Sequence, residues 1–136
     1  MAQIAVSPLS LKDMVLLIGT DSYEKHVSKV QLVPSVTKKT WRGGTPDAVF
    51  TDVSTATWEC QIDYVQDWET ASSLSQYLLD NEGLTKAAVF TPANGVGKQF
   101  AVNLVITPGA VGGTIGDYGT TSVSLGCDKP VATAVI

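Results

Sequence analysis

The sequence predicts a mainly β chain with a single helix near its middle. Several segments alternate apolar and polar residues with a period of two, the pattern of a strand with one buried and one polar face. Glycine, proline and asparagine punctuate these segments, and apolar residues make up 44% of the chain against 16% charged. This composition is typical of a folded, turn-rich protein. At 136 residues, the chain is one domain that can bury a core without disulfides or a bound metal ion to stabilise it.

The clearest strand is predicted at residues 56–64. Its apolar members are Ala56, Trp58, Cys60, Ile62 and Tyr64, and its polar members are Thr57, Glu59, Gln61 and Asp63. The same alternation appears at 100–106 and 123–127, and weaker candidates lie at 14–18, 27–33 and 86–91. Pro92, Asn94, Gly95 and Gly97 connect segment 86–91 to the strand at 100–106, which favours a hairpin there.

One helix is predicted over residues 71–82. Apolar residues recur at Ala71, Leu74, Tyr77 and Leu78. Thr70 is a candidate N-cap, and Gly83 follows the last turn. Asp67 and Glu69 come just before the helix, where carboxylates interact favourably with the positive end of the helix dipole. We interpret them as capping charges rather than catalytic groups.

Motifs that support catalysis or metal binding do not emerge from the sequence. The single histidine, His26, has no nucleophile motif near it, and we expect it to be exposed or at a strand edge. Cys60 and Cys127 occupy inward positions of predicted strands and are interpreted as small buried residues, because a zinc site would need both plus a carboxylate. We expect no metal and no cofactor.

Two glycine-rich runs resemble nucleotide-binding loops only superficially. Residues 95–98 fail as a phosphate loop, because Pro92 stands where its first glycine belongs and Gln99 where Ser or Thr must reach magnesium. Residues 109–113 lack the spacing of a dinucleotide site. An enzyme is therefore the least favoured class, although Asp63, Asp67 and Glu69 could in principle supply paired carboxylates.

Charge is distributed unevenly along the chain. Residues 1–42 carry six bases and three acids, residues 43–85 carry eight acids and no base, and residues 86–136 carry three bases and two acids. A basic surface on one copy can meet an acidic surface on the next, although two independently solvated faces would give the same pattern. The net charge of −4 argues against a dedicated nucleic-acid binder despite Lys38, Lys39 and Arg42 beside Trp41.

Two connections are too long for ordinary turns, residues 35–55 and 108–119. Their apolar members are Val36, Trp41, Val49, Phe50 and Val53 in the first and Val111, Ile115 and Tyr118 in the second. Such loops pack either on their own core or on a neighbouring subunit. We expect the first to be a subunit interface, with Trp41 and Phe50 as anchors and Lys38, Lys39 and Arg42 facing carboxylates of a neighbour.

No apolar run approaches the roughly 18 residues needed to cross a bilayer. The first ten residues have neither the basic start nor the apolar stretch of a secretory signal. We therefore expect the chain to be made and folded in a cytoplasm.

Short motifs spread over nearly the whole chain resemble one protein family, the major tail tube proteins of long-tailed bacteriophages, especially those of actinobacteria. They are VSPL at 6–9, LKD at 11–13, YEKHV at 23–27, TWRG at 40–43, TPD at 45–47, DY at 63–64, QDWE at 66–69, SL at 73–74, YL at 77–78, EG at 82–83, FTP at 90–92, PGA at 108–110 and SVSLG at 122–126. None is a chemical signature by itself. Their order and spacing together carry the resemblance.

The resemblance implies a two-sheet β-sandwich or rolled barrel flanked by the helix. It implies one tail tube domain over 1–136, with an N-terminal arm at 1–13, the long loop at 35–55 and a C-terminal tail at 128–136. Subunits of this family close into rings, expected to be hexameric, which stack head to tail into the tube through which the DNA genome passes during ejection. The implied location is the virion tail, and the implied partners are further copies of the chain and the tape measure, tail terminator and tail-tip proteins.

The lumen of such a tube would be lined by a polar strand face, because hydroxyls and carboxylates let a phosphate backbone slide without specific binding. Our candidates are Thr57, Glu59, Gln61 and Asp63, although the same face could look outward.

Two rival functions remain open. One is a monomeric β-sandwich module that binds carbohydrate or a cell surface through Trp41 and Trp68, since Trp58 faces inward. The other is a tube subunit of a contractile tail or secretion apparatus.

Overall fold

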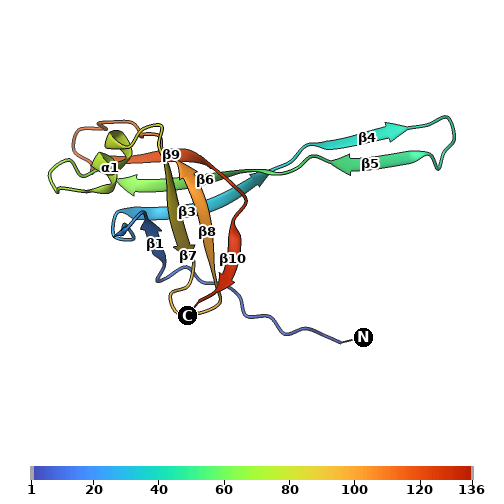
Figure 1. Ribbon diagram of the computed structural model, residues 1–136, viewed down its shortest axis with the longest axis horizontal. Coiled ribbons are helices and arrows are strands. Elements are labelled where there is room, and N and C mark those ends of the chain that lie inside the picture. The colour runs from blue at the N-terminus through green and yellow to red at the C-terminus, as the bar shows by residue number, and fades with distance from the viewer. Residues whose placement is uncertain (1, 136) are drawn as a thin grey trace.

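The computed structural model describes residues 2–135 and is built almost entirely of antiparallel strands (Figure 1). The elements are β1 (Val15–Ile18), β2 (Asp21–Ser22), β3 (Val27–Ser35), β4 (Lys38–Arg42), β5 (Val49–Val53), β6 (Thr57–Val65), α1 (Leu74–Asp80), β7 (Thr85–Thr91), β8 (Lys98–Val105), β9 (Thr120–Cys127) and β10 (Val131–Ala134). The predicted mainly β class with one helix is confirmed.

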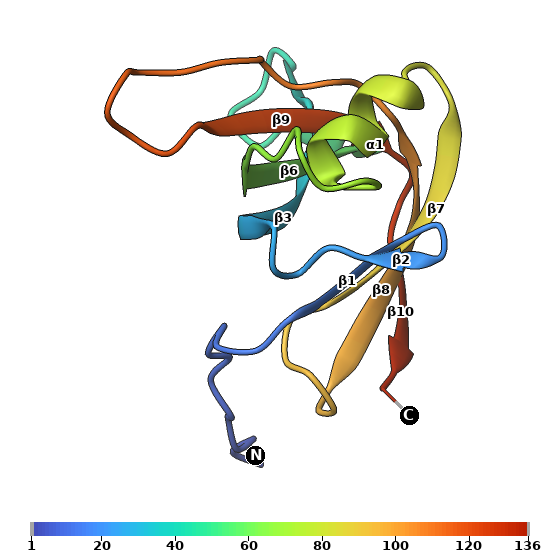
Figure 2. The same cartoon turned by 90° about the vertical axis from the view of Figure 1, so that its left-hand side faces the viewer.

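One sheet rolls over to form both layers of the body. Its strand order is β2-β1-β7-β8-β9-β6-β3, with β10 added to β8. β8 meets β9 at a single pair, Leu104 and Cys127, and there the sheet turns from one layer into the other. Figure 2 shows the β3-β6-β9 layer standing across from the β1-β7-β8 layer, with α1 at one end. The expected rolled architecture is thus present, but its two layers belong to one continuous sheet.

The core lies between the two layers and under α1. The predicted strand at 56–64 corresponds to β6, whose inward residues Cys60, Ile62 and Tyr64 are buried. The opposing layer contributes Leu16, Ile18, Phe90, Val102 and Leu104, and α1 adds Leu74 and Leu78. The period-two pattern of β6 is confirmed, since Thr57 and Glu59 on its other face are exposed.

The predicted hairpin between 86–91 and the strand at 100–106 is confirmed by β7 and β8, which pair from Thr85 and Val105 to Phe90 and Phe100. The glycine-rich residues 95–97 lie in the turn of this hairpin, and Lys98 begins β8. Gly95 and Gly97 have φ of +79° and +78°, a conformation that residues with side chains rarely adopt.

The helix is shorter than predicted, Leu74–Asp80 instead of 71–82, and Thr70 is not its N-cap. Ser73 takes that position, and its side chain accepts a hydrogen bond from the backbone N–H of Gln76. Ser72 has φ of +63°, which keeps the helix from starting earlier. Asp67 closes its own turn by accepting from the backbone N–H of Thr70 and Glu69, both at 3.0 Å. These hydrogen bonds hold the pKa of Asp67 below its usual range.

Two further expectations need correction. Residues 35–55 are not an irregular loop, because β4 and β5 pair there as a separate two-stranded ribbon. Residues 128–136 are not simply a tail, because β10 pairs with β8 from Val131 opposite Ala101 to Ala134 opposite Lys98. His26, expected to be exposed or at a strand edge, instead lies half-buried in the turn just before β3, and its carbonyl accepts from the N–H of Val65. No helix in the described part of the chain is long and apolar enough to cross a membrane.

Candidate functional site

The β4–β5 hairpin projects from the body (Figure 1). It continues the β3–β6 pair outward, and all ten of its strand residues are exposed. Trp41 stands directly opposite Phe50, with ring centroids 6.0 Å apart. Their side chains remain 63% and 64% exposed, so this pair stabilises the hairpin while presenting an apolar surface to solvent.

The hairpin turn holds Trp41 in place. The N–H of Gly43 donates to the carbonyl of Ala48 at 2.7 Å. A Cβ on Gly43 would lie 2.7 Å from the Cβ of Ala48 and 3.0 Å from the Trp41 ring, so the ring packs where a side chain would stand. Only glycine leaves room for this arrangement.

All five predicted interface residues lie on this hairpin, but they divide between its two faces. Strand alternation puts Lys39, Trp41 and Phe50 on one face and Lys38 and Arg42 on the other. Lys39 also stands opposite Asp52, so one charge of opposite sign is already its cross-strand neighbour. This pairing could not be predicted from the sequence, because β4 and β5 were not predicted as strands.

A second projection is the N-terminal arm, residues 2–13. Every residue of it is exposed, including Ile4, Val6, Leu9 and Leu11. In Figure 1 it leaves the body on the same side as the hairpin. Both projections therefore extend apolar side chains in one direction, away from the core.

The lumen candidates lie together on the outer face of the β3-β6-β9 layer. Thr57, Glu59, Gln61 and Asp63 alternate with the buried residues of β6. On this face Lys29 of β3 stands opposite Asp63, and Gln31 stands opposite Gln61. The β9 side adds Ser122 and Ser124, and the hydroxyl of Ser124 donates to Oε2 of Glu59 at 2.9 Å. The result is one continuous polar surface.

This layer has two open edges. Within residues 2–135, β3 pairs only with β6, and β9 pairs with β8 only at Cys127. Unpaired N–H and C=O groups on such edges can accept a strand from another chain. Sequence reasoning did not identify either edge, because edge position depends on strand order.

The body also contains an apolar groove of about 330 Å³ that sequence reasoning missed. It lies between the two layers, beside the base of the N-terminal arm. Its lining includes Leu9, Leu11, Val30, Trp58, Phe90, Phe100 and one charged residue, Lys129. The inward position predicted for Trp58 is consistent with its place in this groove.

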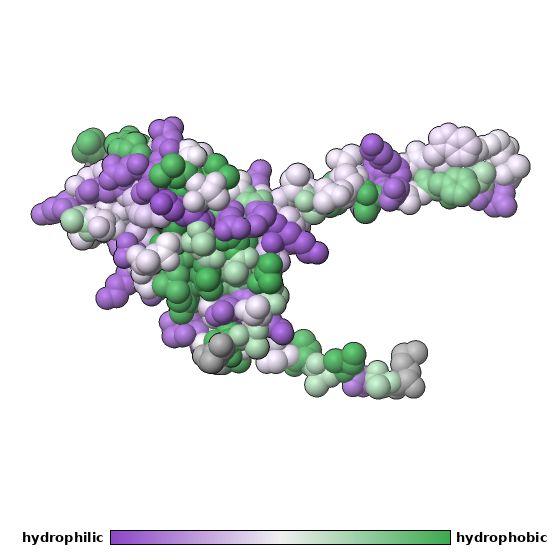
Figure 3. Space-filling model, in the orientation of Figure 1, coloured by the Kyte–Doolittle hydropathy of each residue, from purple (hydrophilic) through white to green (hydrophobic). Residues whose placement is uncertain are grey.

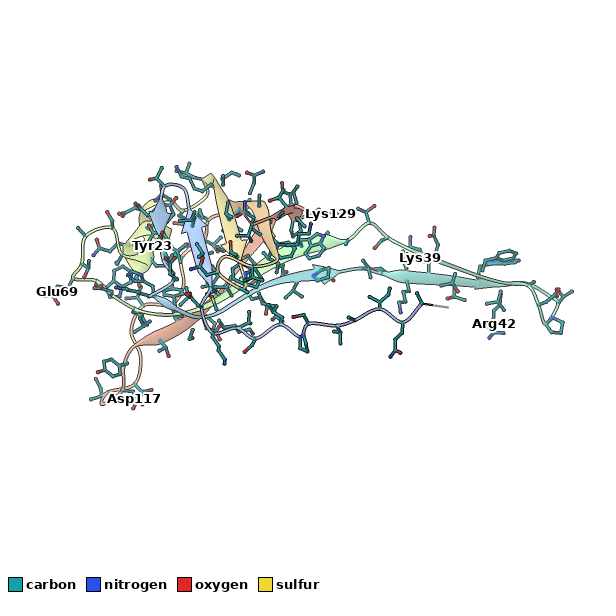
Figure 4. The ribbon with its side chains drawn as sticks, turned by 90° about the horizontal axis from the view of Figure 1, so that it is seen from below. Tyr23, Lys39, Arg42, Glu69, Asp117 and Lys129 are labelled. Carbon is teal, nitrogen blue, oxygen red and sulfur yellow. The ribbon has the colours of Figure 1, made fainter. Side chains whose placement is uncertain are left out.

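The segments around α1 are acidic. The segments around α1, residues 66–84 and 108–119, contain Asp67, Glu69, Asp80, Glu82 and Asp117 and no lysine or arginine. A backbone hydrogen bond joins these segments, from the N–H of Gln66 to the carbonyl of Gly119. Figure 4 shows Glu69 and Asp117 toward one end, Lys39 and Arg42 on the hairpin at the other end, and Lys129 on the body between them. The charge asymmetry of the sequence is only partly an asymmetry in space, because Asp47 and Asp52 of the acidic segment lie on the hairpin with Lys38, Lys39 and Arg42.

Nothing in residues 2–135 groups three or more His, Cys, Asp or Glu side chains as a metal site would require. Cys60 is buried, Cys127 is half-buried, and both are free thiols. Burial and then the nearby Cys127 raise the pKa of Cys60 to about 12, so its thiol is poorly reactive at neutral pH.

Comparison with known proteins gives a likeness in structure but none in sequence. No protein-family model matches the sequence, and no curated protein is similar to it. Among solved structures, the chain is similar to one from the cryo-EM structure of an extracellular contractile injection system, the PVC sheath/tube terminator in its extended state. The TM-score is 0.66, and the match covers 96% of this chain and 100% of that chain at 13% identity. The two chains therefore share a fold.

Proposed function

We propose that this chain is a structural subunit of a phage-tail-like tube that assembles through its own copies. The observation that carries the proposal is the β4–β5 hairpin, whose strand residues are all exposed although Trp41 and Phe50 are large and apolar. An isolated two-stranded ribbon is at best marginally stable in water. Contact with neighbouring copies would bury it. The fold likeness to a chain of an injection-system terminator structure supports the same class.

The open edges of the β3-β6-β9 layer support ring closure as the mode of assembly. The outer edge of β3 in one copy would face the outer edge of β9 in the next, so their unpaired backbone groups would be satisfied. Six such subunits would form a ring with the polar face of β6 toward the lumen. Glu59 and Asp63 would then repel phosphates, and DNA would pass without specific binding.

In this role the chain belongs to a virion tail, is made in the host cytoplasm, and needs no cofactor. It acts as a structural protein and not as an enzyme. Stacked rings would join the tape measure, tail terminator and tail-tip proteins at their ends. A tube subunit or terminator of a contractile apparatus is the second candidate, favoured by the contractile system to which the similar chain belongs.

Electron microscopy of the purified protein at high concentration and low salt tests the proposal. Rings or tubes are expected, and light scattering should give a mass of about six chains for a single ring. Particles of monomer size under all conditions would instead support a monomeric binding module. Tubes that bind a sheath protein from the same source would favour the contractile alternative over a sheathless tail.

A further inference from the structure

The apolar groove opens on the side of the body from which the two projections leave. Figure 3 shows apolar residues gathered on the body between the base of the hairpin and the base of the N-terminal arm. The groove is lined mainly by aromatic and aliphatic side chains, and Lys129 is the one charged residue of its lining. Its volume of about 330 Å³ suits one or two large side chains rather than a whole strand.

A protruding apolar segment lies on the opposite side of the molecule, in the 108–119 loop. Ile115 is 99% exposed and Tyr118 is 90% exposed. The loop is nevertheless held in a defined conformation. Gln66 donates from Nε2 to the carbonyl of Gly112 at 2.7 Å and accepts at Oε1 from the N–H of Gly112 at 2.9 Å. The Tyr64 hydroxyl packs against Gly109, where a Cβ could not fit.

This anchoring distinguishes the loop from a flexible connection. A preorganised loop loses less conformational entropy when it binds, so its exposed apolar residues contribute more to affinity. Of the five carboxylates at this end of the molecule, Asp117 is the only one in the loop, and it lies between Ile115 and Tyr118 in the sequence. The loop therefore offers two apolar side chains and one negative charge.

Charge distinguishes this loop from the other exposed apolar segments. The hairpin carries Lys38, Lys39 and Arg42 against Asp47 and Asp52, so it would bring net positive charge toward Lys129. The N-terminal arm carries both Lys12 and Asp13, so its net charge is zero, and the Asp13 carboxylate already accepts from Nδ2 of Asn94 at 3.3 Å. Asp117 supplies the complementary sign. Opposite charges at the rim of an interface set register and suppress wrong partners.

We propose that Ile115 and Tyr118 of one copy occupy the apolar groove of the next copy, with Asp117 paired to Lys129. The inference rests on the proposed tube function and names the contact that stacks one copy on another. Loop and groove lie on different sides of the molecule, so the contact is heterologous and repeats head to tail. Within one copy, Ile115 and Tyr118 cannot fill the groove, because they lie on a different side of the molecule.

The test is a charge exchange between the two sites. Asp117→Lys and Lys129→Asp are each expected to raise the protein concentration for half-maximal assembly, measured by light scattering at low salt, by about fivefold. The double variant Asp117→Lys with Lys129→Asp restores opposite charges at every contact and should return this concentration close to the wild-type value. Ile115→Ala and Tyr118→Ala should each raise it by about tenfold.

Leu79→Ala is the matched control, because Leu79 is exposed on α1 at the same end of the molecule. It should leave assembly unchanged. If wild-type protein assembles while the Ile115, Tyr118 and Asp117 variants behave like wild type, the stacking contact is wrong and the tube function stands. Single charge variants that are impaired but not restored by the exchange would overturn the Asp117–Lys129 pairing. A wild-type chain that never self-associates would overturn both proposals.

Discussion

The two halves of the long ribbon formed by β3, β4, β5 and β6 differ in what stabilises them. In the β3–β6 half, alternate residues such as Val30, Cys60 and Ile62 are buried against the opposing layer. In the β4–β5 half, every strand residue is exposed, and only cross-strand pairs such as Trp41 with Phe50 hold the strands together. One ribbon thus contains a part supported by its own core and a part whose strand residues have no core beneath them.

Backbone pairing alone therefore does not decide whether a strand stabilises the fold or contributes to assembly. Cross-strand pairs contribute roughly 0.2–1 kcal/mol each, whereas burying a large aliphatic side chain contributes about 1.5–3 kcal/mol. Substitutions in the inner half should therefore act on folding. Substitutions in the outer half should act on assembly.

The largest effect on folding is expected for Ile62→Ala in the inner half. Ile62 is fully buried on β6, and removal of its side chain leaves a cavity between the two layers. We expect a loss of about 2–5 kcal/mol in the free energy of unfolding, measured by urea denaturation. A loss below about 0.5 kcal/mol, the range of ordinary surface substitutions, would mean that the two layers do not pack as described.

In the outer half, Trp41→Ala should abolish tube formation and leave the monomer folded. Truncating an interface anchor costs about 2 kcal/mol or more in association, which is close to a thirtyfold loss of affinity. The midpoint of thermal unfolding should change little, because the side chain is mostly exposed. Val53→Ala on the other face of the hairpin is the control. Normal tubes from the Trp41 variant would remove the hairpin as an anchor.

Alkaline pH should destabilise the body through groups that the hairpin lacks. Burial, followed by the nearby carboxylate of Asp21, raises the pKa of Tyr23 from its ordinary 10.0 to about 12. The unfolded chain therefore releases this proton first, so the stability present below pH 10 is lost as pH rises toward 12. Cys60 acts in the same direction from pH 9.0 upward, because its pKa is also raised in the folded chain.

Unfolding by urea at about pH 8, 10 and 11.5 measures this loss. Tyr23→Phe keeps the ring that packs against His26 and Tyr77 but removes the ionisable hydroxyl. This variant should lose less stability between pH 10 and 12 than the wild type. An identical pH dependence in both proteins would exclude Tyr23 as a contributor.

The smallest effect on folding is expected on the polar face, from Glu59→Lys combined with Asp63→Lys. The lysine introduced in place of Asp63 would stand opposite Lys29, a like-charge pair that costs roughly 0.2–1 kcal/mol. Tubes should still assemble, and they should now retain short single-stranded DNA at low salt, because lysines bind phosphates with release of counterions. Retention is compared with that of wild-type tubes. Unchanged retention would place this face outside the lumen, and loss of assembly would place it in a subunit contact.

Much of the body could be predicted from the sequence, because burial imposes a visible pattern. β6 has one buried face, so Trp58, Cys60, Ile62 and Tyr64 alternate with polar residues and predict the strand closely. The β7–β8 hairpin was predictable for the same reason and from its turn residues. The helix was predictable from its apolar spacing, but the run of hydroxyl residues from Thr70 to Ser73 made its first residue ambiguous.

The outer parts could not be predicted as strands, because nothing there is buried. β4 reads Lys38-Lys39-Thr40-Trp41-Arg42 and has no apolar face, so the segment looked like a loop although its candidate interface residues were identified. β10 is short and fully exposed, and it was expected to be a tail. The groove escaped prediction because residues from β3, β6, β7, β8 and the N-terminal arm form it only after the sheet rolls over.

Hydrogen exchange of the hairpin amides tests the central claim most directly, that β4 and β5 are stabilised by neighbouring copies. The amides of β4 and β5 should exchange rapidly in the monomer and at least about a hundredfold more slowly in assembled protein, roughly 2.7 kcal/mol of added protection. The inner amides of β6 around Ile62 should be strongly protected in both forms. Equal exchange of the hairpin in monomer and assembly would contradict the account.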